Sequence, residues 1–193
     1  MDQIDGLLGG DNVDRSRVVE WLDSLDQWDD VMFSYGHMDR HQALFITKFK
    51  RRICVNRMAS SPALGEAYSS KLAQYQSLEQ EMQDGQSVHT ADQQLNKMLD
   101  AAEKQLESGV YLTGSEYTAA DACFVAVLAR VEYLGLATDW IASRPQVAEY
   151  FKRMKRRASY KKAIGWFGLG VTQAFIFYPT LWGLRFRKMF KQF

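Results

Sequence analysis

This 193-residue chain has few cysteines, almost no net charge and no stretch in which apolar and polar residues alternate. Its two cysteines, Cys54 and Cys123, lie within apolar helical patterns, which argues against a disulfide framework and favours a reducing, intracellular compartment. Without alternation at a period of two, no segment is predicted to form a strand. The first residues are acidic and glycine-rich rather than basic and then apolar, so they do not predict a secretory signal.

The net charge of +1 conceals an asymmetry along the chain. Residues 1–30 contain nine acidic and two basic residues, whereas residues 145–193 contain one acidic and eleven basic residues. We expect the acidic end to face water or a basic partner and the basic end to face an anionic one. Because the basic residues are spread over several predicted helices without aromatic side chains interleaved for base stacking, no nucleic-acid partner is predicted.

The most informative stretch runs from Thr113 to Gly135. Thr118 and Asp121 have the spacing of a capping box, in which each side chain bonds to the other residue's backbone amide. No charged residue follows until Arg130, so at least two turns are apolar on every side. We predict a central buried helix with Thr118 and Asp121 as its structural cap and Cys123 as a small core residue. Arg130 and Glu132 are predicted to pair with neighbours at the helix end.

Apolar spacing predicts further helices, at about residues 14–25, 39–59, 62–83, 90–107 and 145–157. Asp14 and Asp39 are the predicted N-caps of the first two. Residues 29–38 are predicted to be a connector. The helices at 62–83 and 90–107 are amphipathic and separated by a short turn, so we predict that they form an antiparallel hairpin.

In this order the features resemble the C-terminal domain of the cytosolic glutathione S-transferase family. The motifs are a long helical pair, the loop Tyr-Leu-Thr-Gly at 111–114, the cap Ser-Glu-Tyr-Thr-Ala-Ala-Asp at 115–121, and Ser-Arg-Pro at 143–145. The chain is similar to the plant tetrachlorohydroquinone-dehalogenase-like class in segments 48–53, 57–62, 99–103, 127–130 and 143–150. This resemblance implies an all-α fold, a helical bundle like the C-terminal domain of a glutathione S-transferase.

A complete transferase begins with a thioredoxin-like domain that holds glutathione, and we expect that domain to be absent from this sequence. The resemblance then implies a flexible N-terminus (1–13), a short helix and connector (14–38), the helical domain (39–162) and a hydrophobic, basic tail (163–193). We interpret 14–38 as a remnant of the thioredoxin-like domain, in which Ser16 loosely matches a glutathione contact. Glutathione is expected as a cofactor only where another polypeptide supplies the missing domain.

In the family, the helical domain supplies the hydrophobic wall of the electrophile site, mainly from its first long helix. By resemblance, the residues that would line this pocket are Tyr35, Phe45, Phe49, Arg52 and Met58. Ordinary helix packing is the alternative interpretation of these positions. Alternatively, the basic residues of this region form a surface that faces an anionic partner.

Cysteine and histidine give little support for catalysis by this chain alone. His37 and His41 are four residues apart, the spacing of two metal ligands on a helix, but no third ligand is near in sequence, and we predict no metal site. Cys54, close to Arg51, is interpreted as a core residue; the alternative is an exposed thiol with a lowered pKa. No catalytic residue is predicted.

The tail contains 22 residues without a charge, at 163–184, between basic residues on both sides. Its length is enough for a helix to span a bilayer, and its many aromatic residues are typical of a membrane interface. Several glycines and Pro179 make it only moderately hydrophobic. Two interpretations remain open: a membrane contact through 163–193, interfacial or as a tail anchor, and packing on protein.

Two classes of function follow from these observations. The first is a non-catalytic binding protein that keeps the transferase helical fold, contacts a protein partner or a second copy of itself, and serves as an accessory subunit at a membrane. The alternative is part of a glutathione transferase that conjugates electrophilic substrates or removes halide from them reductively. The expected absence of the thioredoxin-like domain favours the first.

Overall fold

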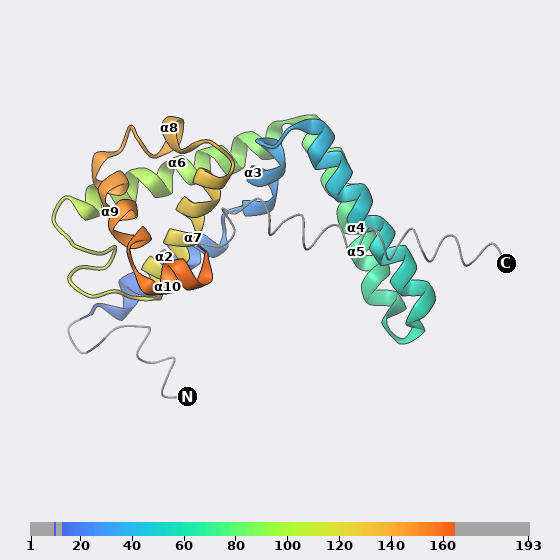
Figure 1. Cartoon of the computed structure of the whole chain (residues 1–193), viewed down its shortest axis with the longest axis horizontal. Helices are drawn as coiled ribbons and strands as arrows, with labels where there is room; N and C mark the ends of the chain where they lie inside the picture. Colours follow the sequence, from blue (N-terminus) through green and yellow to red (C-terminus); the bar gives the residue numbers. More distant parts are fainter. Residues whose placement is uncertain (1–9, 11–12, 165–193) are drawn as a thin grey trace.

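The fold is a set of helices whose starts agree well with the predicted caps. The computed structural model describes residue 10 and residues 13–164 (Figure 1). Its elements are α2 (Arg15–Asp26), α3 (Asp30–Gly36), α4 (Arg40–Ser60), the 3-10 helix η1 (Pro62–Leu64), α5 (Gly65–Asp84), α6 (Gln86–Leu106), α7 (Ala119–Tyr133), α8 (Ala137–Trp140), α9 (Pro145–Lys155) and α10 (Ala158–Ala163). Across these described residues, extended pairing is limited to one isolated bridge between Tyr111 and Gly114. The predicted all-α class is confirmed.

Two predicted N-caps bond as expected. The carboxylate of Asp14 accepts from the amide of Ser16, and that of Asp39 accepts from the amides of His41 and Gln42. Each bond satisfies a donor that the first helical turn leaves without an intrahelical partner. Beyond residue 164, the predicted tail lies outside the described residues. None of the helices within the described ranges is long and apolar enough to cross a membrane.

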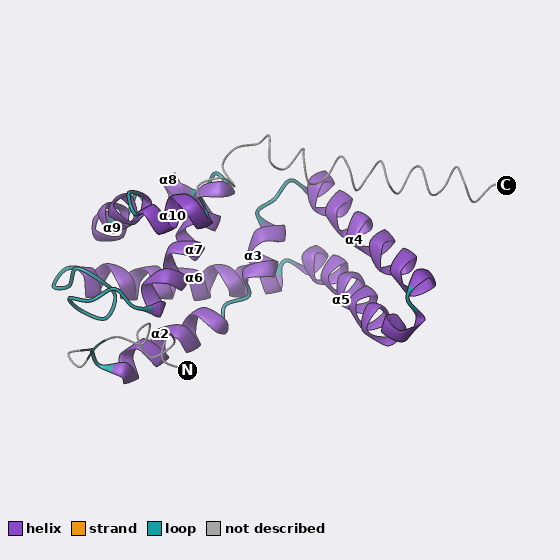
Figure 2. Ribbon diagram, turned by 60° about the horizontal axis from the view of Figure 1, so that its bottom comes forward, coloured by secondary structure: helices purple, strands orange, loops and turns teal. Residues whose placement is uncertain are grey.

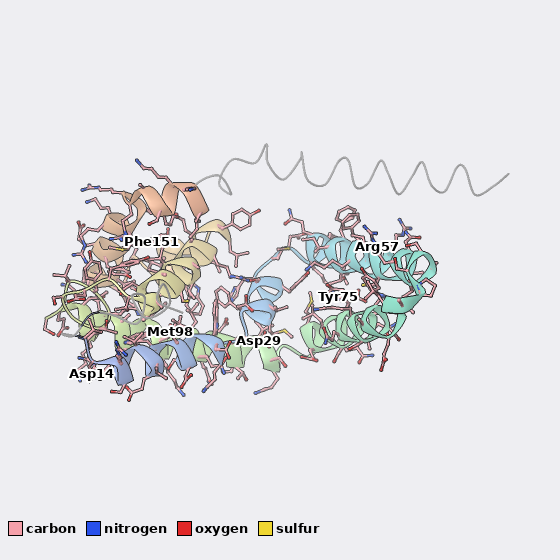
Figure 3. All side chains as sticks on the ribbon, turned by 90° about the horizontal axis from the view of Figure 1, so that it is seen from below. Asp14, Asp29, Arg57, Tyr75, Met98 and Phe151 are labelled. Atoms are coloured by element: carbon pink, nitrogen blue, oxygen red, sulfur yellow. The ribbon has the colours of Figure 1, made fainter. Side chains whose placement is uncertain are left out.

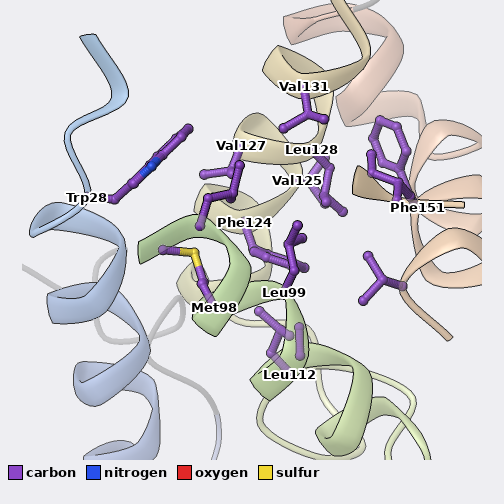
Figure 4. Packing of buried hydrophobic residues seen from close by; sticks show 14 of the residues in the cluster. Trp28, Met98, Leu99, Leu112, Phe124, Val125, Val127, Leu128, Val131 and Phe151 are labelled. Atoms are coloured by element: carbon purple, nitrogen blue, oxygen red, sulfur yellow. The ribbon is translucent and has the colours of Figure 1, made fainter. Parts of the chain in front are cut away.

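The core lies where α6, α7 and α9 meet α2 and α3. The stripe predicted on α6 is buried, with Leu95 and Leu99 fully enclosed. Figure 4 shows the side chains of α6 and α7 packed together, with Phe151 of α9 and Trp28 closing two sides. The largest fully buried members of the core are Tyr150, Phe33, Phe124, Met32, Leu95, Leu99, Leu112 and Leu128. Residues 14–38 therefore pack into the same core as the predicted helical domain.

The capping box at the start of α7 is confirmed and belongs to a larger buried network. Asp121 is fully buried and accepts from the amides of Thr118 (2.9 Å) and Leu112 (3.0 Å) and from the hydroxyl of Tyr150 (2.9 Å). Burial, and then the nearby Asp121 carboxylate, raise the pKa of Tyr150 well above its usual range, so this hydroxyl remains a donor. One carboxylate thus joins the 110s loop, α7 and α9.

The prediction that α7 is buried on every side is wrong. Ala122, Cys123 and Ala126 form an exposed stripe, whereas Phe124, Leu128 and other members of the same helix are enclosed. The stripe is exposed because no described helix covers it, and its small side chains leave little apolar surface in water. Cys123, predicted as a core residue, is therefore an exposed free thiol.

The predicted connector at 29–38 is also a helix over most of its length. It forms α3, which Asp29 caps by accepting from the amide of Met32 at 2.8 Å. Met32 and Phe33 are buried against the bundle. Sequence inspection missed this helix because seven residues are too few for two full repeats of an apolar pattern.

The prediction that α5 forms an antiparallel hairpin with α6 is also wrong. Helix α5 pairs along its length with α4, and the two project together away from the bundle (Figure 2). Figure 3 shows the same separation, with Arg57 and Tyr75 on this projection and Met98 and Phe151 in the bundle. A single residue, Gly85 at φ 71°, joins α5 to α6. One residue is too short to fold two helices back on each other, whereas Ser61 and η1 give α4 and α5 a longer turn.

The base of the projecting hairpin rests on a close contact between α3 and α6. A Cβ atom added at Gly36 would lie 2.5 and 2.6 Å from the two γ-carbons of Val88. We expect Gly36→Ala to lower the free energy of unfolding by about 1–3 kcal/mol, because the packed valine must move. Urea denaturation measures this loss. Adding Val88→Ala should restore part of it by removing the clash, and a double variant no more stable than Gly36→Ala would refute the steric explanation.

Candidate functional site

The candidate site is a cleft between α2 and α7, with a volume of about 670 Å³. Leu22 and Leu25 of α2 form one wall, and Cys123, Ala126 and Val127 of α7 form the other. Asp23, Asp26 and Asp30 stand among the lining residues and give it a polar rim. Cys123 and Ala126, two residues of the exposed stripe on α7, therefore form part of the α7 wall of this cleft.

Arg130 fixes one end of this cleft. Its guanidinium forms an ion pair with Asp30 at 2.7 Å and donates to the hydroxyl of Ser34 at 2.8 Å and to the carbonyl oxygen of Asp30 at 3.2 Å. These bonds tie α7 to α3. Arg130 and Glu132 were each predicted to pair with a neighbour at the end of the helix, and both do. Arg130 pairs with Asp30, and Glu132 accepts from Lys155 at 2.6 Å.

Trp28 holds the loop between α2 and α3 in place at the edge of the cleft. Its indole nitrogen donates to the carbonyl oxygen of Ala91 on α6 at 3.1 Å, and its ring packs against Phe33 with the ring centroids 5.2 Å apart. A buried indole with a satisfied N–H is a rigid wall. The cleft is thus preformed by packing on three helices.

The chemistry of the cleft suits a small neutral aromatic ligand better than an anionic one. Its centre is apolar, its one arginine is already paired, and the remaining charges at the rim are carboxylates. No cluster of three or more metal-ligating side chains occurs in the part of the chain that the structure describes. The ionisable side chains that line the cleft are Asp23, Asp26, Asp30, Cys123 and Arg130.

The structure distributes the five predicted pocket residues along α3 and α4. Tyr35 is buried and its hydroxyl accepts from Lys50 at 3.0 Å. Phe45 and Phe49 stack with ring centroids 6.5 Å apart. The remaining two lie farther along α4, where Arg52 is exposed and Met58 half-buried. None of these five lines the α2–α7 cleft; Phe45 lines a separate hollow of about 700 Å³ with residues of the α3–α4 joint and α7.

Ser16, the loose match to a glutathione contact, is engaged within its own helix. Its hydroxyl donates to the carboxylate of Asp14 at 2.6 Å, and this bond is the main cause that lowers the pKa of Asp14. Ser16 is exposed at the start of α2. A contact between Ser16 and glutathione stays a prediction.

The remaining singled-out residues lie apart from the cleft. His37 bonds to Asp92 at 2.8 Å, and His41 is exposed on α4. Cys54 of α4 is buried, in agreement with its interpretation as a core residue.

Sequence reasoning missed the cleft residues Leu22, Leu25 and Ala126. Both leucines lie in the helix predicted at 14–25, but apolar spacing does not reveal which part of a helix its neighbours leave open. A run of alanine and cysteine is compatible with burial and with exposure. The usable signal was the run of small residues, Ala122, Cys123 and Ala126, because small side chains on one stripe leave room for a ligand.

Residues 72–153 match the family model described as "Glutathione S-transferase, C-terminal domain". Residues 72–153 are therefore similar to the C-terminal domain of the glutathione S-transferase family, and the resemblance drawn from the motifs is confirmed.

Curated relatives agree with this assignment. The chain is 37% identical over 148 residues to "Glutathione S-transferase TCHQD" of Arabidopsis thaliana, covering 77% of this chain and 56% of the relative. It is 28% identical over 156 residues to "Tetrachloro-P-hydroquinone reductive dehalogenase" of Sphingobium chlorophenolicum, covering 79% and 61%. A human protein, "Ganglioside-induced differentiation-associated protein 1-like 1", is 29% identical over 116 residues, covering 54% and 32%. The chain spans less than two thirds of the length of each.

Proposed function

We propose that this chain is the helical, electrophile-binding part of a glutathione transferase, with the α2–α7 cleft as the apolar wall of the substrate site. The cleft carries the proposal, because it is a preformed apolar concavity on a domain of this family. The names of the Arabidopsis and Sphingobium relatives favour this hypothesis over the non-catalytic accessory role that the sequence suggested first.

In this function the chain binds and orients, while a thioredoxin-like domain supplies glutathione. The glutathione thiolate attacks a halogen-bearing carbon of the aromatic substrate, the C–S bond forms, and the carbon–halogen bond breaks to release halide. Holding the aromatic ring against Leu22, Leu25 and Ala126 lowers the entropic cost of bringing the two reactants together. A halogenated hydroquinone is the proposed substrate class, after the name of the Sphingobium relative.

Binding of a chlorinated aromatic compound to the 193-residue chain tests this proposal. 1,2-Dichlorobenzene is a neutral chlorinated aromatic compound and a poor alkylating agent, so calorimetry with it reports binding alone. We expect saturable binding that Ala126→Phe weakens at least about tenfold, because the added ring projects from the α7 wall and fills the cleft. Ala101→Phe is the matched control: Ala101 is also an exposed helical alanine, but it lines the groove between α2 and α6.

A second readout uses the thiol on the wall of the cleft. Cys123 is exposed and Cys54 is buried, so iodoacetamide should modify Cys123 selectively in the native protein. Bound 1,2-dichlorobenzene should slow this modification, and Cys123→Ser should abolish it. Absence of saturable binding, or equal loss in the Ala126→Phe and Ala101→Phe variants, would rule out the cleft as the substrate site.

A further inference from the structure

The projecting hairpin carries a surface that the proposed function does not use. Helix α4 contains six lysine or arginine residues and no acidic residue among its 21 positions. It packs chiefly on α5, and the hairpin stands away from the bundle (Figure 1). Among the described residues, Phe45, Lys48, Arg52 and Val55 are exposed on the side of α4 turned from α5, and we call these four the outer face of α4.

Four of the six cations of α4 fall into two groups. On the inner side, Arg51 pairs with Glu79 of α5 at 3.0 Å, and Lys50 donates to Tyr35 and lies 5.5 Å from the ring centroid of Tyr75. On the outer side, Lys48 and Arg52 are exposed and form no ion pair with any described residue. The inner cations hold the hairpin together, whereas the outer ones leave a positive potential facing solvent.

Apolar side chains are interleaved with these free cations. Phe45 and Val55 are 53% and 54% exposed, and Phe45 stacks on the half-buried Phe49. A mixture of exposed phenylalanine and valine with lysine and arginine on one face is typical of helices at a lipid interface. The outer side of α5 differs: Ser70, Gln74, Ser77 and Glu81 make it polar and slightly acidic.

We infer that the outer face of α4 is a docking surface for an anionic lipid bilayer. Charge complementarity carries this assignment: Lys48 and Arg52 would meet lipid phosphates and carboxylates while Phe45 and Val55 enter the region below the headgroups. The outer face spans residues 45–55, about 15 Å along the helix axis, so its cations and apolar side chains can meet one surface together. A nucleic acid would use the cations but would leave Val55 and the self-stacked phenylalanines without a role.

Vesicle flotation of the full 193-residue chain tests this inference, with vesicles of phosphatidylcholine alone and with added phosphatidylserine. We expect binding to the phosphatidylserine vesicles that weakens with salt, because exposed charges are screened. Lys48→Glu combined with Arg52→Glu should reduce the affinity at least about tenfold, since each basic residue near such a surface contributes strongly. Phe45→Ser should reduce it further at high salt.

The matched control is Lys97→Glu combined with Lys104→Glu, which makes the same change in net charge on exposed positions of α6. This variant should bind vesicles almost as the unmodified chain does. Four results would each overturn the inference: no binding to phosphatidylserine vesicles, equal binding to phosphatidylcholine alone, unchanged binding of the α4 variant, or equal losses in both double variants. Loss of oligonucleotide binding in the α4 variant, with vesicle binding unchanged, would instead assign the surface to nucleic acid.

Discussion

Replacing Asp121 with alanine is expected to lower the free energy of unfolding by at least about 3 kcal/mol. The substitution leaves the amides of Thr118 and Leu112 and the hydroxyl of Tyr150 without their acceptor in the interior. A buried donor without a partner costs far more than an average hydrogen bond contributes. The loss should therefore exceed that of a helix cap alone, which is about 1 kcal/mol. Urea denaturation followed by circular dichroism measures it.

Two further variants distinguish the buried network from a general charge effect. Asp139→Ala removes an exposed carboxylate from the first turn of α8 and should change the free energy of unfolding by less than about 1 kcal/mol. Asp121→Asn keeps the size but puts an NH₂ group where both oxygens accept, so it should also be clearly destabilised. An Asp121→Ala protein as stable as the Asp139→Ala protein would show that this carboxylate does not hold the bundle together.

Replacing Phe124 with alanine is expected to cost about 3–5 kcal/mol of the free energy of unfolding. The ring is fully buried on α7, with its centroid 5.8 Å from that of Trp21 and 6.1 Å from that of Tyr150. Its removal leaves a cavity between α2, α7 and α9, three helices whose positions are fixed by other contacts. The surrounding side chains then cannot collapse fully into the space.

Thermal and urea denaturation should show the loss, and Phe124→Leu should recover much of it by filling part of the cavity. Phe45→Ala is the matched control, since the same change on the exposed side of α4 removes little buried area and should cost less than about 1 kcal/mol. If the two phenylalanine variants lost the same free energy, the core assignment of α7 would be contradicted. Because α2 lines the candidate cleft, Phe124→Ala should also weaken ligand binding there.

The chain's local signals predicted its local structure well. Asp14, Asp39 and Thr118 begin helices as expected, because a cap satisfies backbone donors within four residues and needs no distant partner. The buried stripe of α6 was predicted for a similar reason: a period near 3.6 marks one face of a helix. The family motifs around Thr118 combine both kinds of signal, and they gave the domain assignment.

Which helix covers which face was decided only by the tertiary structure. Apolar spacing on α5 predicted an inward face, but not that α4 rather than α6 would pack against it; the one-residue link at Gly85 settled that choice. The side chains of Ala122, Cys123 and Ala126 have little apolar area. Burying them or exposing them therefore changes the free energy of folding only slightly. The cleft beside them exists because α2, held by Trp28 and by Val18 in the core, leaves that stripe open. The sequence thus determined the helices, their caps and the family, while the packing of distant segments determined the candidate site.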